Sequence, residues 1–534
     1  MVSDITCGIR HNNIMKRLLR LWLLGAAWGL AALLCACQPL PPVAEQAAPD
    51  PLPAPAQFDP ASVYDRVIYT SAGYVGVDHT SRDVRGGALD LRAYVLENSD
   101  NVLMGRYRPQ AFALGATGPE AEDGEQLLLS RTFVSGGVIS LWQPERGQWY
   151  VSDLTAGSYY SGAVFLDSPE CSLFFYLPRT YRQIETGSLE YLPQQDGWLQ
   201  VDYAQDGFEL SLLSPWPGED CITDFLLVNS GERLVDWAYG DAYGLWSAYT
   251  QSGEGRWCFD GYYWPTFDDY SPGGDNYYFR QPSSYLLGSM LAIANRHRLA
   301  ADLSLAMLDT VALWQNEQGY FPSLFTSGWL SGDYGVEAGY FDTRWNSDLL
   351  RHYARGYGQT GADLCLAVMN RYVEYYLGFA QDNHRETANG GWLVADYAPS
   401  APETPCHTSL NHQLAQILVL YELADVLVRD DLLALADRLL LGVVDTETEW
   451  LAADGDLVYG LNVDGSPVGE DYPYLTYNDL YEVQNLLLEV RGQRDPALDR
   501  LMRHKLTWME THGVSGYKGQ LSEEAAEREE TLAE

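Results

Sequence analysis

The chain has 534 residues, of which 46% are hydrophobic and 20% charged, and 33 Lys and Arg against 73 Asp and Glu give a formal charge of −40. This charge excludes a general nucleic-acid binder, which needs a basic surface, and disfavours docking on anionic membrane surfaces. The length predicts several domains, because one core stops growing beyond roughly 250–300 residues. The 37 Tyr and 16 Trp fit either a sugar-stacking surface or an aromatic-rich core.

The first segment has the pattern of an export signal. Residues 16–20 (Lys-Arg-Leu-Leu-Arg) precede an apolar run over 21–34 that is too short to span a bilayer. The run ends in Leu-Cys-Ala-Cys, which resembles a bacterial lipobox, and Cys37 is the expected lipidation site because the small residue Ala36 precedes it. The alternative is a plain signal peptide that is cut elsewhere.

These features predict an exported protein, lipid-anchored to the bacterial cell membrane on its extracytoplasmic side. The signal peptide with its lipobox covers 1–37, a Pro/Ala-rich tether follows over 38–60, and an acidic tail covers 520–534. The membrane is contacted through the N-terminal lipid only, and nucleic acid is not a partner. Five cysteines follow the tether without CxxC spacing, so a zinc ribbon has no support, whereas one or two disulfides stay open.

Residues 61–250 are predicted to form an all-β sandwich. Short apolar or alternating runs, such as 89–96, are separated by Gly, Pro, Asp and Ser. The runs 198–203 and 208–213 flank Ala-Gln-Asp-Gly, which is typical of a β-hairpin because Asp-Gly favours the primed turns.

Beyond about residue 282 the apolar period becomes helical. A unit of apolar helix, polar turn and apolar helix recurs four times, over 286–314, 349–377, 414–441 and 481–509. Such hairpins cannot bury their faces singly and must stack as an open solenoid or a closed α/α toroid. Residues 251–519 are therefore expected to form an incomplete (α/α) toroid of about four helical hairpins, which makes the chain a β + α multidomain protein.

Long segments rich in Gly, Trp, Tyr and Asp separate the hairpins, over 316–340, about 381–408 and about 445–475. Loops of this length in a compact domain are usually functional. Each precedes the first helix of the next hairpin, so all three emerge at one end of the domain. This end is the predicted mouth of a site.

Polar residues gather at the three helix starts that follow these loops. Helix capping explains some of them, namely Asp342, Ser409 and Thr476 with Asp479. Capping does not explain why two His, an Arg, four Tyr and a Trp meet there in a chain with 9 His. The expected substrate-binding residues are Arg344, Trp345, Trp392, His407, Asn411, Tyr474, Tyr477 and Asn478.

Two features have a second interpretation. Trp392 follows a Gly pair and either stacks on a sugar or anchors its own loop. The aromatic and acidic segment 262–278 either lines the cleft or packs in the interface between the β and helical halves of the chain. No cofactor is expected, although Asp454, Asp456 and Asp464 could hold Ca²⁺ without the EF-hand order.

Together these segments resemble the D-glucuronyl C5-epimerase family, over roughly residues 255–515. The resemblance is carried by Gly-Gly-Trp at 390–392, the helix over 409–420, and the Asp-Tyr-Pro turn at 471–473 before an Asn- and Tyr-bearing helix. It implies a uronate-containing glycan as substrate and tyrosines that abstract and return the C5 proton. Tyr472 matches the family's Tyr-Pro element, and Tyr481 follows on the next helix.

A phenol acts as a base only where a cation or hydrogen bonds lower its pKa, and Arg344 and His412 are the cations available. The expected catalytic residues are therefore Tyr472, Tyr481, His412 and Asp479. The charge of −40 departs from the family's pattern, because it repels a long polyanion.

Three other functions stay open. A glycoside hydrolase on the same toroid would use Asp342 or Asp348 with Asp479 or Glu337 as acid and base. A polysaccharide lyase would use a Tyr and a His. A non-catalytic glycan-binding lipoprotein would keep the aromatic residues and tolerate the loss of the acid and base.

Overall fold

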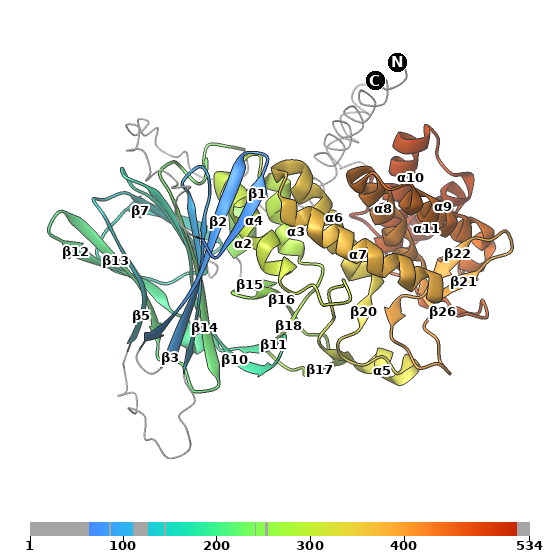
Figure 1. Ribbon diagram of the computed structural model, residues 1–534, viewed down its shortest axis with the longest axis horizontal. Helices are drawn as coiled ribbons and strands as arrows, with labels where there is room; N and C mark the ends of the chain where they lie inside the picture. Colours follow the sequence, from blue (N-terminus) through green and yellow to red (C-terminus); the bar gives the residue numbers. More distant parts are fainter. Residues whose placement is uncertain are drawn as a thin grey trace.

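The computed structural model describes residues 64–84, 87–109, 126–143, 146–240, 242–250 and 255–520. The predicted signal peptide, Cys37, the tether and nearly all of the acidic tail lie outside the described residues. The described chain has an antiparallel β region followed by a helical region, as Figure 1 shows. Among the described residues, none of the helices combines the length and apolarity needed to cross a membrane.

The β region contains two antiparallel sheets. In the described residues the larger sheet has thirteen strands in the order β1-β2-β3-β4-β14-β10-β11-β18-β16-β15, with β9 and β6-β7 attached at β10. Its strands are β1 (Arg66–Thr70), β2 (Gly73–Val84), β3 (Gly87–Val95), β4 (Asn101–Pro109), β6 (Val138–Gln143), β7 (Gln148–Asp153), β9 (Ala163–Asp167), β10 (Ser172–Glu185), β11 (Ser188–Tyr191), β14 (Cys221–Ser230), β15 (Arg256–Cys258), β16 (Gly261–Pro265) and β18 (Tyr277–Arg280). The smaller sheet, in the order β5-β13-β12-β8, comprises β5 (Gln126–Val134), β8 (Gly157–Tyr159), β12 (Trp198–Ala204) and β13 (Gly207–Pro215).

The larger sheet is the middle of three layers. On one face, its Phe175 shares a core with Leu129 and Leu210 of the smaller sheet, which is face-to-face sheet packing. On the other face, its Phe174 shares a core with Leu287 of the first long helical hairpin. The predicted hairpin is present, because β12 and β13 pair around the two residues between Ala204 and Gly207.

The larger sheet continues past residue 250, into a segment that we expected to belong to the helical domain. Tyr278 of β18 pairs with Leu189 of β11, and β16 and β15 extend the sheet further. These strands have three to five residues, too short for an alternating pattern to stand out. The aromatic segment 262–278 thus forms part of the joint between sheet and helices.

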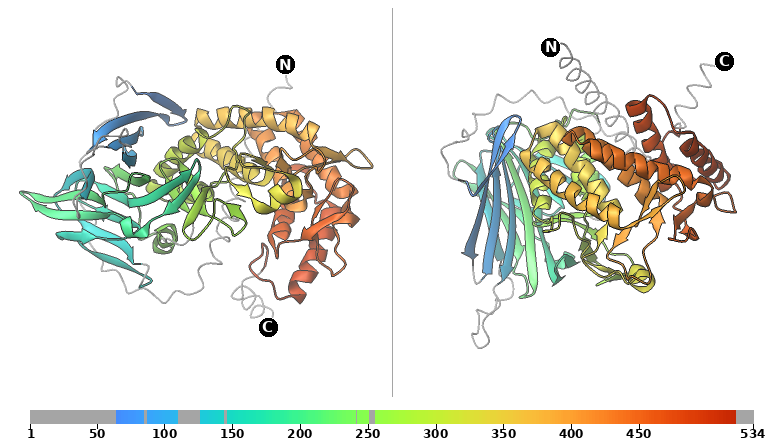
Figure 2. Two further views of the ribbon diagram at one scale, coloured as in Figure 1. Left: turned by 90° about the horizontal axis from the view of Figure 1, so that it is seen from below. Right: turned by 45° about the vertical axis from the view of Figure 1, so that its right-hand side comes forward.

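The helical region is a row of four hairpins, α3–α4, α6–α7, α8–α9 and α10–α11. The first helices lie side by side, α3 against α6, α6 against α8 and α8 against α10, and Figure 2 shows the row from two further sides. The helices are α2 (Ala242–Thr250), α3 (Tyr285–Ile293), α4 (Arg298–Ala312), α5 (Gly328–Tyr334), α6 (Thr343–Thr360), α7 (Asp363–Asp382), α8 (Leu410–Leu427), α9 (Asp430–Asp445), α10 (Leu475–Arg491) and α11 (Pro496–Thr511), with 3-10 turns η1 (Pro193–Gln195) and η2 (Glu447–Trp450). Helix α8 is buried on nearly every side, as an apolar helix in the middle of such a row must be.

The long loops pair with one another just before the helix starts. Asp342 pairs with Tyr397 immediately before α6, and Ser409 pairs with Gly460 immediately before α8. The short strands are β17 (Tyr270–Ser271), β19 (Thr326–Ser327), β20 (Phe341–Asp342), β21 (His384–Glu386), β22 (Trp392–Val394), β23 (Tyr397–Ala398), β24 (Thr408–Ser409), β25 (Val458–Leu461) and β26 (Pro467–Glu470). This pairing places loops from different hairpins at one end of the row.

Candidate active site

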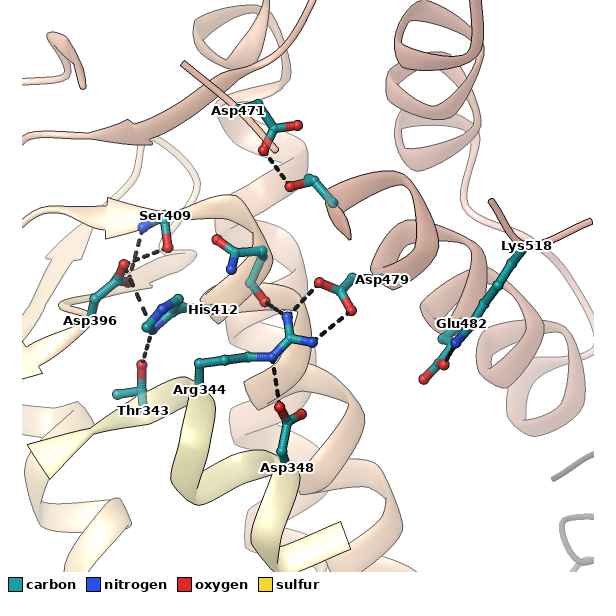
Figure 3. Close-up of polar contacts among 12 residues, drawn as sticks. Thr343, Arg344, Asp348, Asp396, Ser409, His412, Asp471, Asp479, Glu482 and Lys518 are labelled. Carbon is teal, nitrogen blue, oxygen red and sulfur yellow. Dashed lines mark hydrogen bonds and ion pairs between the residues drawn. The ribbon is translucent and has the colours of Figure 1, made fainter. Parts of the chain in front are cut away.

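Arg344 joins the starts of three helices. From the first turn of α6, its Nε donates to Asp348 Oδ2 at 3.1 Å, and its Nη2 donates to Asp479 Oδ1 of α10 at 3.2 Å (Figure 3). Its Nη1 donates to the carbonyl of Asn411 on α8 at 3.2 Å and to the second oxygen of Asp479. The Arg344 side chain is 15% exposed, so the three helices meet at a largely buried cation.

Asp396, in the loop between β22 and β23, holds a second group of polar contacts together. Its fully buried carboxylate accepts from the Ser409 backbone N–H at 2.9 Å and from the Ser409 hydroxyl. His407 Nε2 lies 3.3 Å and His412 Nδ1 3.7 Å from Asp396 Oδ2. Sequence reasoning did not identify Asp396, because only its position in a long loop pointed to it.

His412 lies between Asp396 and Arg344 (Figure 3). Its Nδ1 is 2.9 Å from Thr343 Oγ1, and its Nε2 is 3.4 Å from the hydroxyl of Tyr397. Burial lowers the pKa of His412 to about 4, although Asp396 opposes this shift. At neutral pH the imidazole is therefore uncharged and can accept a proton.

Tyrosine rings pack beside these groups. The ring of Tyr459 lies 5.4 Å from that of His407 and 5.8 Å from that of Tyr472. Tyr472 is 46% exposed. Burial and Asp342 raise its pKa while Arg344 opposes them, so at neutral pH Tyr472 is a phenol that can donate a proton. This differs from the expected phenolate base.

The predicted caps are only partly used as caps. The carboxylate of Asp342 accepts from the Trp345 N–H at 2.8 Å and caps α6, and burial raises the pKa of Asp342 to about 8. Ser409 makes no side-chain cap and donates to Asp396 instead. The hydroxyl of Thr476 donates to Asp471. Among the described contacts, Thr476 and Asp479 therefore do not form the expected capping box.

Some predicted binding residues lie elsewhere. The Trp392 ring stacks on His384 with centroids 3.7 Å apart, and the guanidinium of Arg438 lies 4.5 Å from its centre. The Trp392 side chain is 8% exposed and packs against protein, as the loop-anchor interpretation requires. The ring of Trp345 stacks on Phe279 at 5.7 Å in a cluster of aromatic side chains.

Three predicted residues of α10 face the C-terminal segment. The Tyr477 ring meets Tyr517 at 5.4 Å, and the Asn478 side chain accepts from the Lys518 N–H at 2.8 Å. Tyr481 lies beside Gly519. The helix turns these residues away from Asp479, because a step of one or two residues rotates a side chain by 100–200°.

Three further aromatic residues belong to the segments that form the site. Tyr474 is 42% exposed. Tyr285 of α3 donates to Asp348 Oδ2 at 3.3 Å. Trp329 of α5 is 38% exposed and lies 5.6 Å from the His407 ring. Sequence reasoning did not single out Tyr285 or Trp329, although Trp329 belongs to the first long loop.

The aspartates considered for Ca²⁺ have protein partners. Asp456 pairs with Lys505, the Asp454 side chain accepts from the Asp456 N–H, and Asp464 accepts from Ser466. In the part of the chain that the structure describes, His, Cys, Asp and Glu form no group of three or more that could hold a metal ion. The five cysteines of the described ranges are free thiols: Cys171, Cys221, Cys258, Cys365 and Cys406.

Comparisons with known proteins give likenesses of fold. No family model matches the chain. A search of the curated proteins also finds no match. Among solved structures, the chain is similar to a D-mannose isomerase at 14% identity, over 51% of this chain and 70% of that chain, with a TM-score of 0.35. It is similar to cellobiose 2-epimerase from Spirochaeta thermophila at 13% identity, over 51% and 67%, with a TM-score of 0.35.

A third similar structure is a family 76 glycoside hydrolase from a bovine Bacteroides thetaiotaomicron strain. The identity is 10%, over 77% of this chain and 75% of that chain, and the TM-score is 0.33. Scores at this level do not decide which reaction the site performs.

Proposed function

We propose that this chain is a carbohydrate-active enzyme built on an incomplete α/α toroid, and that its site transfers a proton at a carbon of a sugar. The observation that carries the proposal is that an uncharged imidazole and a half-exposed phenol both interact electrostatically with Arg344. These groups are His412 and Tyr472. A base, an acid and a cation at one mouth are the groups that epimerisation needs.

The groups have complementary roles. His412 accepts a proton from the carbon beside a carbonyl or carboxylate, and Tyr472 returns a proton from the other face of that carbon. Arg344 donates a hydrogen bond to the negative oxygen of the enolate-like intermediate, through the one N–H group that its described contacts with Asp348, Asp479 and Asn411 leave over. Exposed aromatic faces such as Trp329 hold the sugar ring.

Two substrate classes fit this chemistry. The resemblance to the C5-epimerase family favours a uronate-containing glycan, with exchange at C5. The ion pairs favour a neutral sugar with exchange at C2, because Arg344 is already neutralised by Asp348 and Asp479. The overall charge of −40 also favours a neutral substrate, because it repels a polyanion.

Hydrolysis has less support from the contacts. Asp348 and Asp479, two of the proposed acid and base residues, both bind the Arg344 guanidinium. Asp342 is 3% exposed and caps α6. A general acid needs a carboxyl group that reaches the glycosidic oxygen.

The test is incubation of the full chain in D₂O with uronate oligomers and, separately, with neutral reducing disaccharides. We expect deuterium at C5 or at C2 without chain cleavage, detected by NMR. New reducing ends would indicate hydrolysis, and an unsaturated product absorbing in the ultraviolet would indicate elimination. Binding of a glycan without any of these products would indicate a non-catalytic glycan-binding protein and would contradict the proposal.

We also propose that the protein is anchored by lipid at Cys37 and faces the extracytoplasmic side. Cys37→Ser removes the thiol that receives the lipid, so labelled fatty acid should no longer be incorporated and the protein should leave the membrane fraction. The matched control is Cys35→Ser, which leaves the residue after Ala36 intact. Equal labelling of Cys37→Ser and the unaltered chain would contradict the anchor.

A further inference from the structure

Asp396 is held in place through both its backbone and its side chain. Its backbone N–H donates to the carbonyl of His407 at 3.0 Å, and its carbonyl accepts from the Thr343 N–H, also at 3.0 Å. Its fully buried carboxylate accepts from the backbone N–H and the hydroxyl of Ser409. These hydrogen bonds fix the position of the carboxylate beside the starts of α6 and α8.

The fixed carboxylate faces one particular nitrogen of the His412 ring. Asp396 Oδ2 lies 3.7 Å from Nδ1 of His412, and the Thr343 hydroxyl lies 2.9 Å from the same nitrogen (Figure 3). The other nitrogen, Nε2, lies 3.4 Å from the hydroxyl of Tyr397. The two ring nitrogens thus meet different groups, a carboxylate and an alcohol at Nδ1 and a phenol at Nε2.

These neighbours favour one tautomer of the uncharged imidazole. A carboxylate only accepts hydrogen bonds, so the ring is more stable with its proton on Nδ1 than with a lone pair there. The Thr343 hydroxyl fits either tautomer, because it both donates and accepts. Burial raises the pKa of Tyr397 well above its usual value, so at neutral pH the phenol has a proton to donate to Nε2.

We propose that Asp396 is a positioning residue of the candidate active site, which holds His412 in the tautomer with the proton on Nδ1. Nε2 then carries the lone pair that accepts the proton from the sugar carbon. The catalytic part of this inference rests on the proposed function, in which His412 is the base. The tautomer itself is observable without any substrate.

Other charged groups act on the same ring, so the effect of Asp396 has a distinctive sign. Burial lowers the pKa of His412, Arg344 and His407 lower it further, and Asp396 and Asp348 oppose them. Removal of the Asp396 charge alone should therefore lower the pKa of His412. A change that only loosened the packing would raise this pKa, because water would reach and stabilise the imidazolium.

The first measurement is the tautomer of His412 in the unaltered full chain. NMR of protein labelled with ¹⁵N-histidine separates the protonated from the unprotonated ring nitrogen at neutral pH. The signals of His412 are identified by their absence from His412→Asn. We expect the proton on Nδ1, and a proton on Nε2 would overturn the inference without any variant of Asp396.

The second measurement uses Asp396→Asn, which replaces a carboxylate oxygen by an amide that can donate to Nδ1. We expect the proton of His412 to move to Nε2 and deuterium incorporation in D₂O to fall by about 10²–10⁴-fold. The pKa of His412, measured by NMR titration, should decrease. In a folded variant, an unchanged tautomer or a pKa that rises toward 6.5 would show that Asp396 only supports the loops, and would overturn the inference.

Two controls separate the carboxylate from the loop that carries it. Ser409→Ala removes the hydroxyl that donates to Asp396 but keeps the charge, so it should retain the tautomer and lower the rate less than about tenfold. Asp445→Asn is the matched control, because Asp445 accepts from the backbone N–H of Asn389 at 3.0 Å and from its side chain at 2.7 Å. It should change neither the tautomer nor the rate.

The outcomes distinguish this inference from the proposed function. If Ser409→Ala moved the proton from Nδ1 as Asp396→Asn does, loop packing rather than the carboxylate would set the tautomer. If the unaltered chain incorporated no deuterium, the proposed function and the catalytic role of Asp396 would both fail, while the NMR measurements would still decide the tautomer. Folding of each variant is checked by its circular dichroism spectrum and urea midpoint.

Discussion

Arg344→Met is expected to lower the free energy of unfolding by about 3–5 kcal/mol and to lower turnover by about 10²–10³-fold or more. Asp348 and Asp479 are 10% and 8% exposed at their side chains, and both pair with this guanidinium. Methionine fills a similar space but leaves two buried carboxylates without a counter-ion. The carbonyl of Asn411 also loses its hydrogen bond from Arg344.

Urea denaturation measures the loss of stability as a shift of the midpoint at constant slope. The matched control is Arg429→Met, since Arg429 pairs with Glu374 and Asp431, which are 70% and 48% exposed. Exposed pairs contribute about 0–1 kcal/mol. If Arg344→Met costs no more than Arg429→Met, the cation does not hold the three helix starts together.

A folded Arg344→Met protein also tests the chemistry, by deuterium incorporation in D₂O. The intermediate that Arg344 stabilises would no longer form, and turnover should fall by about 10²–10³-fold at least. Turnover close to that of the unaltered chain would remove Arg344 from the mechanism while leaving its structural role intact.

His412→Asn is expected to lower kcat by about 10²–10⁴-fold, because the proton acceptor is lost. Asparagine keeps a polar atom near the position of Nδ1, so the contact with the Thr343 hydroxyl can persist. The matched control is His384→Asn, because His384 stacks on Trp392 and its Nδ1 lies 2.9 Å from the carbonyl of Ala380. Deuterium incorporation per minute is the measurement, and equal losses in both variants would contradict the assignment.

The pH dependence provides a second test of His412. Since burial lowers its pKa to about 4, the base form persists well below neutral pH. The rate kcat/KM should therefore decline as pH falls through about 4, on a limb that His412→Asn lacks. A limb near pH 6.5 instead would mean that the imidazole titrates like an exposed one.

The free energy of unfolding should also depend on the protonation of His412. The folded pKa of about 4 lies below the ordinary value of 6.5, so between these values the unfolded chain binds more protons. The free energy of unfolding then falls as pH falls through this window, by on the order of 3 kcal/mol from His412. The partly buried His352, whose pKa desolvation lowers to about 3, adds a further loss of stability in the same direction. His412→Asn should remove only the part of the loss that His412 contributes.

The helical hairpins were predictable from local pattern alone. Apolar residues at helical spacing placed all four units, and α6, α8 and α10 begin next to the polar residues that marked the helix starts. Their position at these starts predicts Arg344, His412 and Asp479 as site residues. In the structure, Arg344 binds Asp479 directly, and His412 lies next to Asn411, whose carbonyl Arg344 also binds.

Other parts of the site could not be read from local pattern. Asp396 and Trp329 lie in long loops without periodicity, and no short-range signal distinguishes them from other loop residues. Trp392 followed a Gly pair that suggested an open approach, yet its indole meets His384 and Arg438. The Gly pair instead allows close packing, because a Cβ at Gly391 would lie 2.3 Å from the backbone nitrogen of Gly442.

The sequence by itself determined the order of the β and helical regions, the four hairpins and the end of the row at which their loops emerge, since these depend on periodicity and chain direction. Only the tertiary structure decided which loop residues meet and in which protonation state. Burial lowers the pKa of His412 and raises that of Tyr472, and burial depends on what every other segment places around a side chain.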